Sequence, residues 1–136
     1  MRIATAEDVP AIVEMGAKLH ATAPFADVPY DREATAGFVG KVIEHGVVFL
    51  ADGGMCGGVL SPSYFNPAHV VAAELFWWAP VGGGRELREA FERWARAAGA
   101  AAVQFSGLAN DRLEAVTRVY RRGGFEPVEM SFVKRL

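Results

Sequence analysis

The sequence has one cysteine, no clustered histidines and no excess of positive charge, and each shortage excludes a class of protein. Cys56 is the only cysteine among 136 residues. It excludes an internal disulfide framework and is typical of a reducing compartment, so we expect a cytoplasmic protein. The three histidines do not form ligand spacing with Cys56, so we expect no metal site. A formal net charge of −2 provides no basic field for a polyanion, and we expect no nucleic-acid partner.

Long hydrophobic runs are also missing. No segment reaches the roughly 18 to 20 apolar residues that span a bilayer, and Glu7 and Asp8 lie where a signal peptide would be apolar. We therefore expect no membrane partner. Hydrophobic residues nevertheless make up 51% of the chain, and its length suits one domain over residues 1–136, with one core and one functional site.

The hydrophobic spacing predicts alternating helices and strands. Helices are expected over residues 9–21, 32–45, 85–98 and 112–122, capped in turn by Thr5 with Asp8, by Asp31, by the glycines before Arg85, and by Asp111 with Glu114. Strands are expected at the start of the chain and over residues 47–51, 55–60, 70–78, 101–106 and 125–133. The helix between the strands at 70–78 and 101–106 implies that these two are parallel, whereas the hairpins are antiparallel, so the sheet is mixed.

Three glycines, Gly82, Gly83 and Gly84, come directly before the third helix. They leave several backbone N–H groups free to point at one anion, and Arg85 could add a charge-assisted contact, so the turn could bind a diphosphate. The alternative is that they only make a tight connection, but a tight turn needs one glycine, so three favour a ligand. The turn lacks the Gly-Lys-Ser/Thr of a P-loop, and a dinucleotide fold expects glycine where Leu87 stands.

Glu74 is the only charged residue in the predicted strand 70–78. An isolated carboxylate is costly there unless it is paired, solvated in a cleft or protonated. Burial would favour its neutral form and make it a better base. Strand alternation places it on the same face as Phe76 and Trp78. The alternative is a structural salt bridge to an arginine.

Taken together, these elements and motifs resemble the GNAT superfamily of acetyl-CoA-dependent N-acetyltransferases, and in particular its small bacterial and phage-type members. The resemblance covers nearly the whole chain. It rests on residues 74–85, on the second half of a pyrophosphate loop and on a Tyr-x-x-x-Gly-Phe motif; the motif residues are Gly82, Gly84, Arg85, Leu87, Tyr120, Gly124 and Phe125.

The resemblance implies an α/β (α+β) fold with a mixed, mostly antiparallel central sheet of six to seven strands and about four flanking helices. It also implies transfer of an acetyl group from acetyl-CoA to a primary amine of a small molecule or peptide, by direct attack in a ternary complex. Backbone N–H groups near residues 77–79 would polarise the thioester, Glu74 would accept the amine proton and Tyr120 would protonate the thiolate. The coenzyme would contact Trp77, Trp78, Ala79, Gly82, Gly83, Gly84, Arg85 and Glu86.

Several alternatives stay open. Tyr120 shares an apolar stripe with Val116 and Val119 and could be a packing residue. The loops at 22–30 and 61–69 should line the acceptor pocket, where Phe25, Tyr30 and Tyr64 would contact the amine or only anchor the loops. The protein could also be a catalytically degenerate coenzyme A-binding or structural module, or an acyltransferase that uses a longer acyl-CoA or a hydroxyl acceptor. The resemblance further allows a homodimer.

Overall fold

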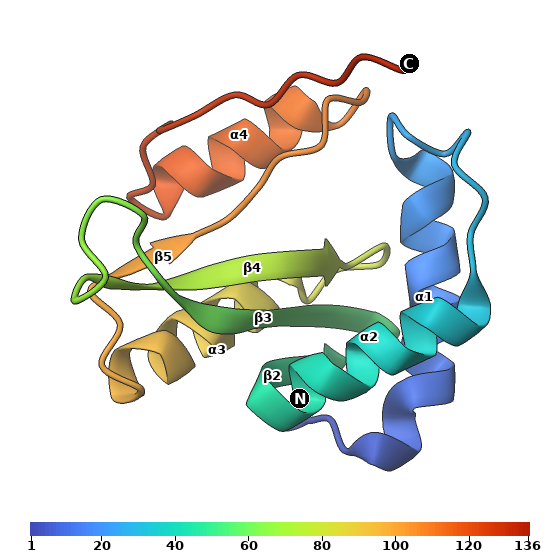
Figure 1. Ribbon diagram of the computed structural model, residues 1–136, viewed down its shortest axis with the longest axis horizontal. Coiled ribbons are helices and arrows are strands. Elements are labelled where there is room, and N and C mark those ends of the chain that lie inside the picture. The colour runs from blue at the N-terminus through green and yellow to red at the C-terminus, as the bar shows by residue number, and fades with distance from the viewer. The chain divides into compact units, whose positions relative to one another are not determined.

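Five strands form one sheet in the order β1-β2-β3-β4-β5 (Figure 1). The computed structural model describes residues 1–136 and divides into two compact units, residues 1–106 and 107–136; the sheet lies in the first. The strands are β1 (Arg2–Ile3), β2 (Gly46–Ala51), β3 (Gly54–Pro62), β4 (Val70–Trp78) and β5 (Ala102–Gln104). As predicted, β4 and β5 are parallel and the other pairs are antiparallel.

The predicted number of six to seven strands is too high. Residues 125–133 contain no strand, although Val128, Met130 and Phe132 alternate with polar residues. A strand needs a neighbour for its backbone groups, and no segment pairs with this one. The strand expected over residues 101–106 is also shorter, because its ladder with β4 ends at the pair Ala73–Gln104.

Four helices are present, as predicted: α1 (Val9–Thr22), α2 (Arg32–His45), α3 (Gly84–Ala97) and α4 (Leu113–Arg122). The first follows a short 3-10 helix, η1 (Ala6–Asp8), with a capping box, and Asp31 caps α2 by accepting a hydrogen bond from Ala34 N–H at 2.9 Å. The cap predicted for α4 from Asp111 and Glu114 is wrong, because the N-cap residue is Arg112 and no side chain makes a cap hydrogen bond to this helix. None of the helices combines the length and the hydrophobicity that a membrane-spanning segment requires.

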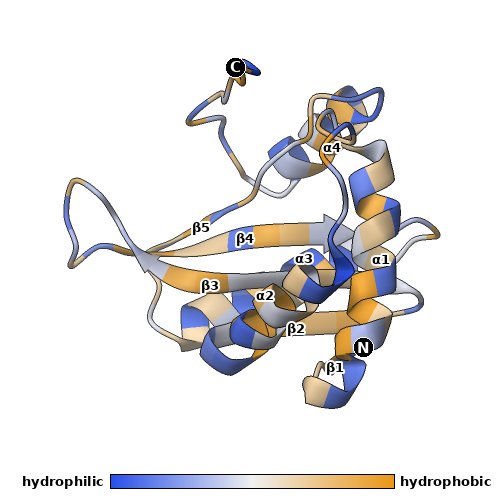
Figure 2. Cartoon of the chain, turned by 45° about the vertical axis from the view of Figure 1, so that its right-hand side comes forward, coloured by the Kyte–Doolittle hydropathy of each residue, from blue (hydrophilic) through white to orange (hydrophobic).

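The sheet is covered on both faces. On one face, α1 and α2 contribute Ile12, Val39 and Val42 to a cluster with Val48 and Met55. On the other face, the apolar side of α3 packs on a second cluster built from alternate residues of the same strands. Figure 2 shows β2 mostly hydrophobic and α1 with hydrophobic and hydrophilic bands in alternation. This burial on two faces holds β4 in place between the helices.

Candidate functional site

A β-bulge in β4 lies beside the candidate base. Gly57 of β3 pairs with Phe76, but the next residue, Gly58, pairs with Glu74, so Leu75 is an extra residue without a partner in β3. A bulge of this kind interrupts the regular alternation of side chains along a strand. The alternation of side chains between the two faces of the sheet is therefore shifted by one residue on passing Leu75.

Because of the bulge, Glu74 lies on the α3 side of the sheet. A Cβ atom at Gly58, which stands opposite Glu74, would lie 2.7 Å from the Phe91 ring of α3. Phe76 and Trp78 pack against the other cluster, beneath α1 and α2. The expectation that Glu74 shares their face is wrong, because one inserted residue reverses the facing of every residue beyond it.

The Glu74 carboxylate is held across the end of the β4–β5 ladder. Its Oε2 accepts a hydrogen bond from Ser106 N–H at 3.1 Å, two residues beyond the end of β5. No ion pair to an arginine forms, so the alternative of a structural salt bridge is wrong. Burial raises the pKa of the Glu74 carboxyl from 4.5 to about 7, and the Ser106 hydrogen bond offsets part of this rise. The group therefore titrates near neutral pH, where a general base works best.

The edge of β4 next to Glu74 lacks a paired strand. The β4–β5 ladder ends at Ala73 and Gln104, while β4 continues to Trp78, as Figure 1 shows. Strand residues direct backbone N–H and C=O groups to both sides, so residues 74–78 present groups along this edge that no strand uses. Two of these residues, Trp77 and Trp78, belong to the span 77–79 whose backbone N–H groups the resemblance assigns to polarising a thioester.

The glycine turn follows directly. Gly82 and Gly83 have φ angles of +115° and +73°, which L-residues rarely adopt, and Gly83 is the N-cap of α3. A Cβ at Gly84 would lie 3.1 Å from the Trp77 ring, so glycine here lets the helix approach β4 closely. The chain geometry accounts for all three glycines without a ligand, and their number alone does not point to one.

What favours a ligand at this turn is its open backbone. No side chain caps the N-terminus of α3, and nothing lies within 4 Å of a Cβ built at Gly82 or Gly83. The first N–H groups of the helix therefore have no side-chain acceptor at this open turn, where the helix dipole is positive. Arg85 instead binds Glu89 through Nε at 2.7 Å, in an exposed pair of a kind that contributes only about 0–1 kcal/mol.

Tyr120 lies in α4, in the second unit, and its motif has a local structural explanation. Phe125 N–H donates to Tyr120 C=O at 3.0 Å and Gly124 N–H to Arg121 C=O at 3.1 Å, while Gly124 has a φ of +83°. This is a Schellman cap, and the Tyr120 and Phe125 rings make its hydrophobic contact at 5.6 Å. The Tyr-x-x-x-Gly-Phe pattern thus ends a helix.

An open cleft of about 420 Å³ lies between the end of α1, the loop 23–31 and the start of α2. Two predicted acceptor residues, Phe25 and Tyr30, line it, and Tyr30 is fixed by donating its hydroxyl to Val13 C=O at 2.8 Å. Tyr64 does not line it: this side chain is 92% exposed and packs only edge-on against Phe65. The full lining is His20, Phe25, Val28, Pro29, Tyr30, Asp31, Ala34, Thr35 and Phe38.

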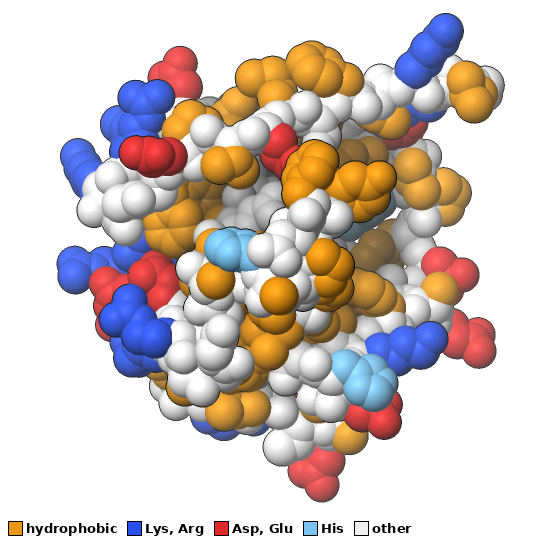
Figure 3. Space-filling model, turned by 60° about the vertical axis from the view of Figure 1, so that its left-hand side comes forward, with side chains coloured by type: hydrophobic (Ala, Val, Ile, Leu, Met, Phe, Trp, Pro, Cys, Tyr) orange, Lys and Arg blue, Asp and Glu red, His pale blue; other side chains and the backbone are white.

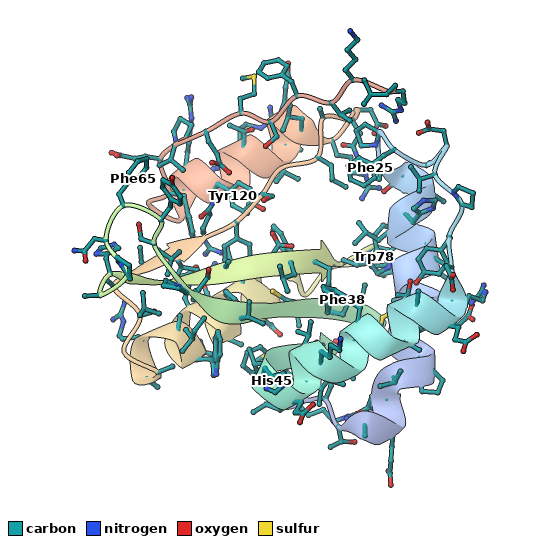
Figure 4. The ribbon with its side chains drawn as sticks, viewed as in Figure 1. Phe25, Phe38, His45, Phe65, Trp78 and Tyr120 are labelled. Carbon is teal, nitrogen blue, oxygen red and sulfur yellow. The ribbon has the colours of Figure 1, made fainter.

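The contribution of α2 to this cleft was not predicted from the sequence. Phe38 reads as part of the apolar face of that helix, yet its side chain is 48% exposed and lines the cleft with Phe25. Figure 4 shows both at the end of the sheet where α1 and α2 lie, with Phe65 at the opposite end. An aromatic residue one position before the buried Val39 was the available signal, since it falls at the border of the apolar stripe.

Charges of both signs are interspersed on the surface. On the face drawn in Figure 3, Lys and Arg side chains lie beside Asp and Glu side chains, and hydrophobic side chains gather near the centre. No group of three or more His, Cys, Asp or Glu residues could hold a metal ion. The buried Cys56 thiol has a raised pKa, chiefly through burial and further through the Glu74 charge, so it stays protonated and unreactive.

Neither a protein-family model nor a curated protein matches this sequence, whereas solved structures match it over nearly its full length. An aminoglycoside acetyltransferase, AAC(6')-Iy in complex with a CoA-containing bisubstrate analog, has a TM-score of 0.73 at 15% identity, covering 99% of this chain and 95% of that one. A Trypanosoma brucei acetyltransferase has a TM-score of 0.69 at 18% identity, covering 99% and 97%. A transcriptional regulator from Bacillus halodurans has a TM-score of 0.71 at 16% identity, covering 99% and 97%. At these identities the likeness establishes a shared fold.

Proposed function

We propose that this chain, which has the fold of the GNAT acetyltransferases, moves an acetyl group from acetyl-CoA to a primary amine. The observation that carries the proposal is the open, uncapped N-terminus of α3 at the end of the strand that bears Glu74. An anion site and a base that titrates near neutral pH thus belong to one continuous segment. The bisubstrate complex of the aminoglycoside acetyltransferase supports coenzyme A as the acyl carrier.

The turn fits a pyrophosphate by its donors and by its space. The N–H groups of residues 83–86 open α3, and Gly82 and Gly83 leave room for oxygen atoms to approach the backbone. An anion at a helix N-terminus gains from the aligned peptide dipoles and satisfies N–H groups that have no partner within the helix. Arg85 can exchange its exposed pair with Glu89 for a phosphate at small cost.

Glu74 is proposed as the general base. Above a pH of about 7 its carboxylate is ionised and can accept the proton that the attacking amine loses, directly or through a water molecule. Ser106 N–H holds the carboxylate at the gap between β4 and β5. When bound, acetyl-CoA supplies a thioester whose carbonyl is open to attack by the neutral amine. The backbone N–H groups near residues 77–79 would then stabilise the developing oxyanion.

Tyr120 is proposed as the acid that protonates the departing thiolate. Its support is the Tyr-x-x-x-Gly-Phe motif together with the fixed end of α4, where the Schellman cap orients the ring against Phe125. Phe25 and Tyr30, which line the cleft at the end of α1, are proposed to contact the acceptor. The proposed reaction needs no metal.

The coenzyme site can be tested with two matched variants, Gly83→Asp and Gly83→Asn. Both residues tolerate the left-handed conformation found here at a cost of about 1 kcal/mol, and each new side chain enters open space. Only Gly83→Asp adds a negative charge, and two like charges about 4 Å apart repel by about 1–4 kcal/mol. In calorimetric titration with coenzyme A, Gly83→Asp should therefore bind about tenfold or more weakly than Gly83→Asn. Equal affinities would show that the phosphates bind elsewhere.

Turnover distinguishes an enzyme from a coenzyme-binding module that has lost its activity. Thiol release from acetyl-CoA, followed with a panel of primary amines, should depend on the amine and should rise with pH through about 7 as Glu74 ionises. Tight coenzyme binding without thiol release for any amine would favour the inactive module. The same experiment with propionyl-CoA tests the acyl preference.

A further inference from the structure

We infer that the cleft between α1 and α2 binds the apolar, preferably aromatic, body of a primary amine that carries a single positive charge. The inference rests on the proposed function, since it names the class of acceptor for the transfer. The residues that line the cleft support this inference. The volume of the cleft, about 420 Å³, is that of a small-molecule pocket.

The wall is mainly hydrocarbon and aromatic. Phe25, Val28 and Phe38 line it and are 46%, 55% and 48% exposed, so about half of each side chain is in water in the absence of a ligand. Covering such surface with an apolar group is favourable by about 25 cal/mol per Å². A ring placed against Phe25 and Phe38 would also gain from aromatic contacts.

The polar side chains of the wall offer little to a hydroxylated ligand. Tyr30 donates its hydroxyl to Val13 C=O, and Thr35 donates its hydroxyl to the Asp31 backbone C=O at 2.6 Å. The buried His20 Nε2 atom has no hydrogen-bond partner, so it is one atom of the wall that a ligand hydroxyl could satisfy. A sugar with several hydroxyl groups would lose most of its other hydrogen bonds to water here without replacement, at a cost of roughly 1–3 kcal/mol for each unpaired group.

Negative charge in the cleft wall is also limited. Asp31 is the only acidic residue among the lining residues, and its Oδ1 already accepts the hydrogen bond that caps α2. A polycationic acceptor such as an aminoglycoside has several ammonium groups, but the cleft wall offers them a single carboxylate, and one of its oxygens already accepts a hydrogen bond. A monoamine needs no more than this, because its single nitrogen is the group to be acetylated.

The cleft lies close to the proposed catalytic strand. The strand β4 contacts α1, and Figures 1 and 2 both place the C-terminal end of β4 beside that helix. An amine whose body occupies the cleft can thus direct its nitrogen toward this end of β4. Because Glu74 faces the α3 side of the sheet, the amine proton would reach its carboxylate through water. Tyr30 keeps the wall in position, because Gly16 leaves room for its hydroxyl: a Cβ at that residue would lie 2.6 Å from it.

The test compares 2-phenylethylamine, ethylamine and neamine as acceptors. The wild-type kcat/KM should be highest for 2-phenylethylamine and lowest for neamine. Phe38→Ala should lower kcat/KM for 2-phenylethylamine about tenfold and have a much smaller effect on kcat/KM for ethylamine. Phe65→Ala is the matched control, because Phe65 is 93% exposed and lies outside the cleft, and it should change neither value. A preference for neamine, or equal effects of the two Phe→Ala changes, would overturn the inference.

Binding without coenzyme separates this inference from the proposed function. Calorimetric titration of 2-phenylethylamine into the wild type, Phe38→Ala and Ala34→Trp needs no turnover. Ala34 is exposed at the start of α2, so tryptophan there should fill the cleft without disturbing the core, and binding should be lost. Binding that the two variants lose, with no acetyl transfer in any assay, would support the cleft and refute the acetyltransferase. Unchanged binding in both variants would refute the cleft.

Discussion

Replacing Glu74 by glutamine should make the protein more stable at alkaline pH while making the enzyme slower. The folded protein holds this carboxyl with a pKa of about 7 against an ordinary 4.5, so between these values the folded chain binds a proton that the unfolded chain has lost. By linkage, this raised pKa adds stability below about pH 4.5, and that contribution is lost as the pH rises through about 7. A difference of about 2.5 pH units corresponds to about 3 kcal/mol.

Glutamine removes this titration and keeps the shape of the side chain. Its Oε1 can still accept from Ser106 N–H, but its amide brings a new buried donor that costs roughly 1 kcal/mol if unpaired. We therefore expect Glu74→Gln to be slightly less stable than wild type at pH 5 and more stable by about 2 kcal/mol at pH 8. Urea unfolding at the two pH values measures both quantities.

The change in free energy of unfolding between pH 5 and pH 8 is the decisive value. Asp8, whose pKa is lowered by its hydrogen bonds to Arg2 and Thr5, stays ionised throughout this range. Any other group that titrates is common to both proteins and cancels in the difference. Glu33→Gln, at an exposed position of α2, should retain the wild-type pH dependence. An identical pH dependence in Glu74→Gln would refute the proton-binding state of this carboxyl. The turnover of Glu74→Gln is a separate measurement. A loss of about 10²-fold or more would identify Glu74 as the base, whereas retained turnover would show that Glu74 has only a structural role.

Two further predictions concern the acid and the helix glycines. Tyr120→Phe keeps the ring that packs on Phe125, so it should leave stability and coenzyme affinity nearly unchanged and lower kcat about 10²-fold; equal losses of affinity and turnover would indicate a packing residue. Gly37→Ala meets nothing within 4 Å and should raise the urea-unfolding free energy by about 1 kcal/mol. Gly16→Ala should be less stable than Gly37→Ala by roughly 1–2 kcal/mol, because its Cβ would displace the Tyr30 hydroxyl from Val13 C=O. Equal gains at the two glycines would show that Tyr30 moves freely.

The helices could be predicted from sequence because their signals are local. Asp31 caps α2, the glycine turn starts α3 and Gly124 ends α4, each acting within one helical turn of its own position. The strand at 70–78 was equally clear, as an apolar run with one carboxylate. The resemblance to acetyltransferases, based on the order of these elements and two short motifs, agrees with the fold of the matching structures.

The direction in which Glu74 faces could not be predicted, because it depends on how β4 pairs with β3. One unpaired residue, Leu75, moves the carboxylate to the α3 side. The sequence of residues 70–78 contains no signal that indicates a β-bulge. The strand prediction for residues 125–133 was wrong for a related reason. The alternation of these residues suits a strand, but a strand forms only where another segment pairs with its backbone groups.

By itself, the sequence determined the helices, the Asp31 cap of α2, the one ionisable residue of β4 and the glycine turn, because these depend on interactions between residues a few positions apart. Only the tertiary structure decided the register of β4, the raised pKa of Glu74 and the cleft that α2 completes with Phe38. Each of these arises where segments distant in the chain meet, and the burial and pairing they create are properties of the assembled sheet and helices.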